Sequence, residues 1–180
     1  MAVAFETIAE SFRRLRKFVL HDLELIVSEA TGGNYAAVLL VTSACEALGR
    51  LRFGTESGGN LLFRDYLLPN DWQPVAGHLY DALRNGLAHG YAAKTIVQVG
   101  DRPVELVISW REKEHLSFAA EQSQLFINVQ VLAEALGEAF DRYEKELRSR
   151  PELRERYRRW VRKKAEVHVT RPRDQEVWHQ

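Results

Sequence analysis

The stretch NYAAVLLVTSACEALGRLRF, residues 34–53, is apolar on almost every side when it is drawn as a helix. A surface helix carries one apolar stripe, whereas a helix that is apolar nearly all round is typical of the centre of a bundle. Gly32 and Gly33 favour a turn just before it, and Asn34 can cap its first turn. We therefore expect a central helix from residue 35 to about residue 53, with other helices packed around it.

The segments on both sides carry apolar residues at steps of three and four, which places these residues on one face of a helix. This spacing predicts helices over about residues 4–29, 75–89 and 123–148. Pro151, which is tolerated in a first helical turn, starts a further helix that extends to about residue 165. Residues 54–73 are rich in turn formers, so we expect a loop there, with one short helical piece around residues 61–66.

After residue 90 the pattern changes to the β-branched, apolar composition of strands. TIVQV (95–99) and VELVISW (104–110) flank a short turn and predict a β-hairpin, to which residues 115–118 can add a third strand. A ribbon of two or three strands is marginally stable alone, so it should pack against the helices. The expected fold class is mainly α, with four to five helices and a small antiparallel β-ribbon at about residues 95–118.

The length and composition fit one globular domain, since 46% of the 180 residues are hydrophobic and 28% are charged. We expect this domain over residues 1–165 and a loosely ordered tail over residues 166–180. The composition excludes a disordered or collagen-like chain, and the single cysteine, Cys45, cannot close an intramolecular disulfide. No long apolar run and no secretory signal pattern occur, so we expect a cytoplasmic protein without a membrane partner. No metal-binding spacing occurs either, and we expect no metal and no cofactor.

The 25 basic and 25 acidic residues balance, but the basic ones are concentrated near the C-terminus. Residues 142–164 hold eleven Lys or Arg against four Glu, which gives this segment a net charge of +7. Such a segment permits an anionic partner such as RNA, and its alternative role is that of a solvated helix face. The candidate RNA-binding residues are Arg154, Arg158 and Arg162.

The most informative segment is LYDALRNGLAHGY, residues 79–91. On a helical projection its apolar residues share one side, and the opposite arc holds His78, Asp81, Arg84, Asn85 and His89. His78, Asn85 and His89 form one stripe, and the long side chain of Arg84 can reach toward it. A cation, an amide and an imidazole can therefore converge on one anion, although polar residues on an outer helix face are also the ordinary case.

These side chains suit the cleavage of an RNA phosphodiester. The reaction needs a base for the 2′-hydroxyl proton, an acid for the leaving oxygen and a fixed cation for the phosphate. Imidazole can serve either proton role near neutral pH, and Arg binds phosphate oxygens through its planar fork. One histidine does not readily act as base and acid in one step, so the chemistry favours a homodimer in which two copies share a cleft.

Arg84, Asn85, three further residues and His89 resemble the motif of the HEPN superfamily, and Tyr91 extends the resemblance to HEPN toxins that pair with nucleotidyltransferase antitoxins. The resemblance implies an up-and-down bundle of four to five helices that dimerises through the motif helices. It also implies a metal-independent endoribonuclease that leaves a cyclic phosphate, with Arg84 on the phosphate, His89 carrying the proton and Asn85 as the polar second position. Tyr91 would be the residue that the antitoxin modifies. The alternative is a non-catalytic HEPN-like dimeric module that binds a partner protein or a nucleotide.

Glu46 is the one acidic residue of the otherwise apolar segment 34–53. A carboxylate is costly to bury alone, so Glu46 either pairs with a basic group such as Arg84 or reaches water at the rim of the bundle. Asp81 competes as a local partner of Arg84.

Overall fold

The structure is a computed structural model that describes the backbone of residues 5–28, 34–90, 96–99, 102–109, 114–119 and 123–165. Its side chains are described for residues 8–27, 34–86, 103–109, 114–119 and 123–162. The helical elements are α1 (Phe5–Ser28), α2 (Asn34–Phe53), α3 (Gly58–Leu62), the π-helical turn η1 (Phe63–Leu67), the 3₁₀ turn η2 (Asn70–Val75), α4 (Ala76–Gly90), α5 (Val129–Ser149) and α6 (Pro151–Ala165). The strands are β1 (Ile96–Val99), β2 (Arg102–Ser109), β3 (Ser117–Phe118) and β4 (Gln124–Asn128).

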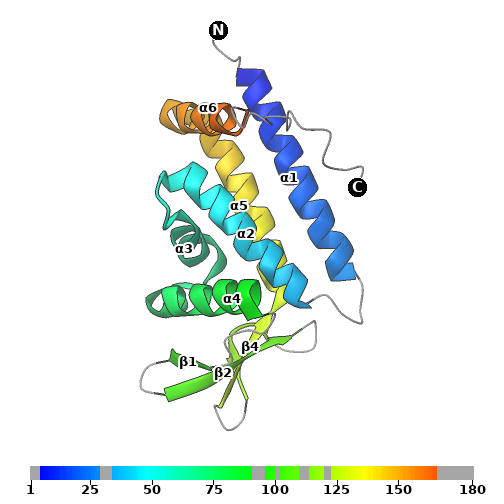
Figure 1. Cartoon of the computed structure of the whole chain (residues 1–180), viewed down its shortest axis with the longest axis vertical. Coiled ribbons are helices and arrows are strands. Elements are labelled where there is room, and N and C mark those ends of the chain that lie inside the picture. Colours follow the sequence, from blue (N-terminus) through cyan, green and yellow to red (C-terminus); the bar gives the residue numbers. More distant parts are fainter. Residues whose placement is uncertain are drawn as a thin grey trace, which may run out of the picture.

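Helix α2 is the centre of the fold, as its apolar sequence predicts. It contacts α1, α3, α4, α5, α6 and strand β2. Helices α1, α2 and α5 lie side by side along the long axis, α6 lies across one end, and α4 lies across the other end next to the sheet (Figure 1). The mainly α class is therefore confirmed, but α4 and α6 cross the long helices instead of continuing an up-and-down bundle.

An aromatic cluster joins three helices at the end of the molecule that carries α6. The ring of Phe12 in α1 lies 5.8 Å from that of Phe140 and 5.2 Å from that of Tyr143, both in α5, measured between centroids. It also lies 6.0 Å from the ring of Tyr157 in α6. All four side chains are buried, and such tilted and edge-to-face pairs stabilise a core beyond their burial alone. The cluster fixes α6 against α1 and α5.

Glycines bring α2 and α3 into backbone contact. A Cβ atom on Gly49 of α2 would overlap the carbonyl group of Gly58, and one on Gly58 would overlap the backbone of Gly49. The short helical piece predicted around residues 61–66 is present within the segment 54–73, but it is longer than expected, because Gly58 and Gly59 are buried and begin a helix. A residue without a side chain permits this spacing, and tertiary packing overrides the turn preference of the pair.

The β-element is larger than the predicted ribbon. Strands β1 and β2 form the expected antiparallel hairpin, but the sheet has four strands in the order β1-β2-β4-β3, and β2 pairs with β4 in parallel. Strand β4 covers residues that the helical spacing assigned to the start of α5. Leu125 and Ile127 are buried in the alternation of a strand, and the side chain of Asn128 accepts hydrogen bonds from the backbone N–H groups of Gln130 (2.9 Å) and Val131 (3.4 Å). This cap starts α5 at Val129.

Candidate functional site

Helix α4 carries the segment that the sequence analysis singled out, and its two faces are as predicted. Leu79 and Leu83 are fully buried toward α2 and the core, and Ala82 is buried beside them. His78 and Asp81 are exposed, and Asn85 is half-buried. The polar arc of α4 therefore lies at the surface of the molecule.

Arg84 pairs with Glu46 of α2, the first of the two alternatives for this carboxylate, and Glu46 also keeps 22% of its side chain exposed. Arg84 Nε donates to Glu46 Oε2 at 3.0 Å, and its Nη2 donates to the same oxygen. Its Nη1 donates to Asn85 Oδ1 at 3.3 Å, which ties the first two motif residues together. The other carboxylate oxygen of Glu46 accepts from Arg50 Nη2 at 2.6 Å. Asp81 forms no ion pair with Arg84 in the described part of the chain.

The cluster of Arg84, Glu46 and Arg50 keeps a net charge of +1 and stays open to solvent. The side chains of Arg84 and Arg50 are 38% and 50% exposed, and that of Glu46 is 22% exposed. The hydrogen bond to Glu46 raises the pKa of Arg84, so its guanidinium is charged at every ordinary pH. Three of the five N–H groups of Arg84 are used by Glu46 and Asn85, and two are left for a ligand. A fixed, half-exposed cation with unused donors can bind a phosphate.

The residues behind this cluster set the distance between α2 and α4. The hydroxyl of Tyr80 in α4 donates to the carbonyl oxygen of Thr42 in α2 at 3.3 Å, and burial raises the pKa of Tyr80, which keeps the phenol neutral. A Cβ on Gly59 of α3 would overlap the Tyr80 hydroxyl and crowd the backbone of Glu46. Tyr80, Gly59 and Arg50 are not among the site residues that the sequence predicts. The i, i+4 spacing of Glu46 and Arg50 is a signal that could have found Arg50.

His89 lies five residues after Arg84 in the same helix, about 7.5 Å along its axis. The side chain of His89, and Tyr91 as a whole, lie outside the described residues. The cation and its two orienting partners are therefore placed by the structure, and the role of the imidazole stays a prediction.

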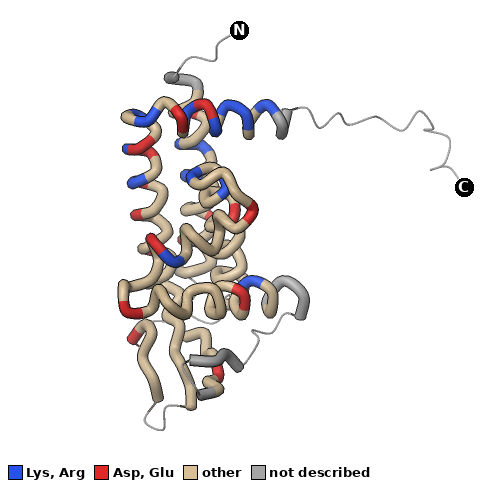
Figure 2. Tube along the Cα trace, turned by 90° about the vertical axis from the view of Figure 1, so that its left-hand side faces the viewer, with Lys and Arg blue, Asp and Glu red and all other residues tan. Residues whose placement is uncertain are grey.

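The three predicted RNA-binding arginines of α6 lie in different environments. Arg154 Nη1 donates to the carbonyl oxygens of Leu147 (3.0 Å) and Arg148 (2.9 Å), so it closes the C-terminus of α5. The Arg158 side chain is 26% exposed and lies 3.4 Å from a carboxylate oxygen of Glu155. Arg162 is exposed. Lys and Arg residues are distributed along α6, at the end of the molecule away from the sheet (Figure 2).

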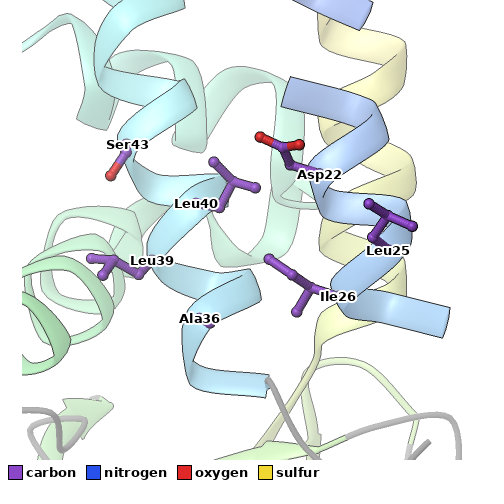
Figure 3. Close-up of a pocket in the computed structure, with 7 residues that line it drawn as sticks. All are labelled: Asp22, Leu25, Ile26, Ala36, Leu39, Leu40 and Ser43. Atoms are coloured by element: carbon purple, nitrogen blue, oxygen red, sulfur yellow. The ribbon is translucent and has the colours of Figure 1, made fainter. Parts of the chain in front are cut away.

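A second surface feature is an open apolar groove of about 580 Å³ between α1 and α2. Leu25 and Ile26 line it from α1, and Leu39 and Leu40 line it from α2, with Asp22 at one edge (Figure 3). In the part of the chain that the structure describes, no helix is both long and apolar enough to cross a membrane.

The described residues contain no group of three or more His, Cys, Asp or Glu side chains that could hold a metal ion. Comparison of the chain with protein-family models, with curated protein sequences and with solved structures found no match.

Proposed function

We propose that this chain is a HEPN-like endoribonuclease that cuts RNA in the cytoplasm without a metal ion, as the toxin of a toxin–antitoxin or defence system. The observation that carries the proposal is the orientation of Arg84. Its guanidinium is held by Glu46 and Asn85 at the surface, and two of its N–H groups have no partner among the residues that the structure describes. A guanidinium that is fixed by two partners and open to solvent can bind phosphate oxygens through its remaining N–H groups.

In this mechanism Arg84 binds the non-bridging oxygens of the phosphate. The 2′-oxygen attacks phosphorus while an imidazole takes its proton, and the bond from phosphorus to the 5′-oxygen breaks. A second imidazole donates a proton to the departing oxygen, so the products are a 2′,3′-cyclic phosphate and a 5′-hydroxyl. Arg84 and His89 are the proposed catalytic residues. Glu46 and Asn85 are positioning residues, because they act on RNA only through Arg84.

The second imidazole comes from a second copy of the chain in this proposal. His78 and Asp81 are exposed on the outer face of α4, where a two-fold related copy can approach. Tyr91 is the proposed target of a nucleotidyltransferase-type antitoxin. Light scattering at micromolar concentration tests the dimer, and a strictly monomeric species would contradict this arrangement.

The chemistry is tested by incubating RNA with the purified protein and excess chelator. Wild type should produce ends with a cyclic phosphate, and Arg84→Ala and His89→Ala should each reduce the rate by about 100-fold or more, because a phosphate-binding cation and a proton carrier contribute at that scale. Arg14→Ala and His21→Ala, two exposed positions on α1, are matched controls that should cut at the wild-type rate. Equal cleavage by all five proteins, or cleavage abolished by the chelator, would refute the mechanism.

The second candidate function is a non-catalytic HEPN-like module that binds a partner protein. The apolar groove between α1 and α2 favours it, because Leu25 on its wall is 55% exposed and an exposed apolar surface often marks an interaction site. This candidate gains if the wild type never cuts RNA and Leu25→Asp releases a copurified stoichiometric partner.

A further inference from the structure

A pocket of about 450 Å³ opens between the C-terminal end of α2, residues 54–56 and helix α6. This volume lies in the range of small-molecule sites, about 300–1,000 Å³. Arg50 lines the pocket and also holds Glu46 by the 2.6 Å ion pair, so the pocket begins one helical turn from the Arg84–Glu46 contact. Neither Arg50 nor the part of α6 that faces it belongs to the RNA-binding residues predicted from the sequence.

One wall of the pocket is built around Gly54. Its φ of +76° is in the left-handed region, and its N–H donates to the carbonyl oxygen of Arg50 at 2.9 Å, which ends α2. A Cβ at this position would lie 3.0 Å from Nε of Arg156 in α6. The Nη1 group of Arg156 donates to the carbonyl oxygen of Arg52. Arg156 is therefore fixed across the end of α2.

The charges of the pocket favour an anion. Three cations, Arg50, Arg156 and Arg159, line the pocket with one carboxylate, Glu56, and the net charge is still +1 when Glu46, the partner of Arg50, is included. The C-terminal dipole of α2 contributes about −0.5 of a charge, which is too little to reverse the sign. Arg159 is exposed and forms no ion pair with any residue that the structure describes. Its fork is oriented by no carboxylate and can turn toward a phosphate.

An aromatic wall stands beside these cations. The half-buried Trp160 lines the pocket, and its ring lies 5.9 Å from that of Tyr157, measured between centroids. An indole in a pocket wall offers a surface for a base, and base stacking on aromatic side chains tolerates every base. A cationic end and an aromatic wall within one pocket match the two parts of a nucleotide.

We infer that this pocket binds a phosphorylated nucleoside, with its phosphate on Arg50 and Arg159 and its base against Trp160. The ligand is either a free mononucleotide or one nucleotide of a single-stranded RNA. The inference does not require that the chain cleaves RNA.

Calorimetric titration of the full chain tests the inference, with AMP, adenosine and inorganic phosphate as probes at low salt. AMP should bind at least about tenfold more tightly than adenosine or phosphate alone, because only AMP engages both walls. Arg159→Gln should weaken AMP binding about tenfold, and Arg14→Gln, an exposed position on α1 outside the pocket, should leave it unchanged. Glu56→Gln should tighten AMP binding, a gain that a misfolded variant does not give.

A second experiment distinguishes a free nucleotide from a nucleotide of RNA. Binding of a short single-stranded RNA is measured by fluorescence anisotropy in the His89→Ala background, in which the RNA should stay uncut. If Arg159→Gln weakens both AMP and RNA binding, the pocket holds a nucleotide of RNA; if it weakens AMP alone, the ligand is a free nucleotide. No detectable AMP binding by wild type, or an equal loss in Arg159→Gln and Arg14→Gln, would overturn the inference. AMP binding is measured without RNA cleavage, so the nucleotide site can be confirmed or refuted even if the chain does not cut RNA.

Discussion

Two Arg–Glu pairs tie helices together in this protein, and they differ in their surroundings. Arg52 of α2 and Glu146 of α5 are 17% and 14% exposed, and Arg52 Nη2 donates to Glu146 Oε1 at 3.1 Å while its Nε lies 2.6 Å from Oε2. Arg52 also donates to the Tyr66 hydroxyl at 3.2 Å. Arg84 and Glu46 make a similar pair, but their exposed fractions are 38% and 22%.

The difference separates a cation that holds the fold from one that can meet a ligand. The Arg52 pair is enclosed by two helices and the η1 turn, so removal of one partner leaves a charge away from water. The Arg84 pair is more open to solvent, mainly through its guanidinium, and ion pairs contribute less to stability as their exposure rises. The same two residue types therefore have different roles, and the degree of burial decides whether the pair stabilises the fold or can bind a ligand.

The largest expected effect tests this division directly. Arg52→Ala should lower the free energy of unfolding by about 3–5 kcal/mol, because Glu146 is then buried without its partner. Arg84→Ala should lower it by less than about 1 kcal/mol, because Glu46 retains Arg50 and solvent. Urea denaturation measures both. Equal losses in the two variants would break the comparison, and cleavage by the folded fraction of Arg52→Ala should stay at the wild-type level.

The next effect concerns the loss of stability at low pH. The contribution of His115 to this loss must be known before the pH dependence of either ion pair can be interpreted. His115 accepts a hydrogen bond from the backbone N–H of Asn128 at 3.1 Å, and burial lowers its pKa from 6.5 to about 4. The unfolded chain takes up this proton first, so stability is complete above pH 6.5 and falls as the pH drops toward 4. The loss amounts to up to about 3 kcal/mol.

His115→Gln should flatten this part of the stability curve, as followed by urea denaturation between pH 7 and pH 4. His21→Gln, an exposed position on α1, should keep the wild-type slope. If both variants keep it, the acid sensitivity comes from other groups, such as the carboxylates of the two pairs.

The smallest effect sharpens the role of Glu46. Glu46→Gln keeps an oxygen acceptor but removes the charge that orients Arg84, so kcat for RNA cleavage should fall about five- to tenfold while the unfolding free energy changes by less than about 1 kcal/mol. Glu10→Gln, in an exposed pair with Arg14, is the control. An unchanged kcat would show that Asn85 alone suffices to hold the guanidinium.

The helices were predictable because their apolar residues repeat with the helical period over long segments. The cost of leaving one acid alone in an apolar helix made the Glu46–Arg84 contact one of two alternatives, and only the structure decides for it. The strand β4 was missed because Leu125 fits both the helical spacing of the next element and the alternation of a strand, and pairing with β2 decides between them. The role of Arg154 was hidden for a related reason: a run of basic residues does not reveal which guanidinium meets the carbonyl groups of a neighbouring helix.

The glycine contact between α2 and α3 has a mechanical consequence for the residues around Arg84. Where side chains separate two helices, a small displacement is absorbed by a change of rotamer, but at Gly49 and Gly58 main chain rests on main chain. Gly59 in turn lies close to the Tyr80 hydroxyl, so a shift of α3 would press on helix α4. The position of the Arg84 guanidinium thus depends on the close packing at three glycines, Gly49, Gly58 and Gly59.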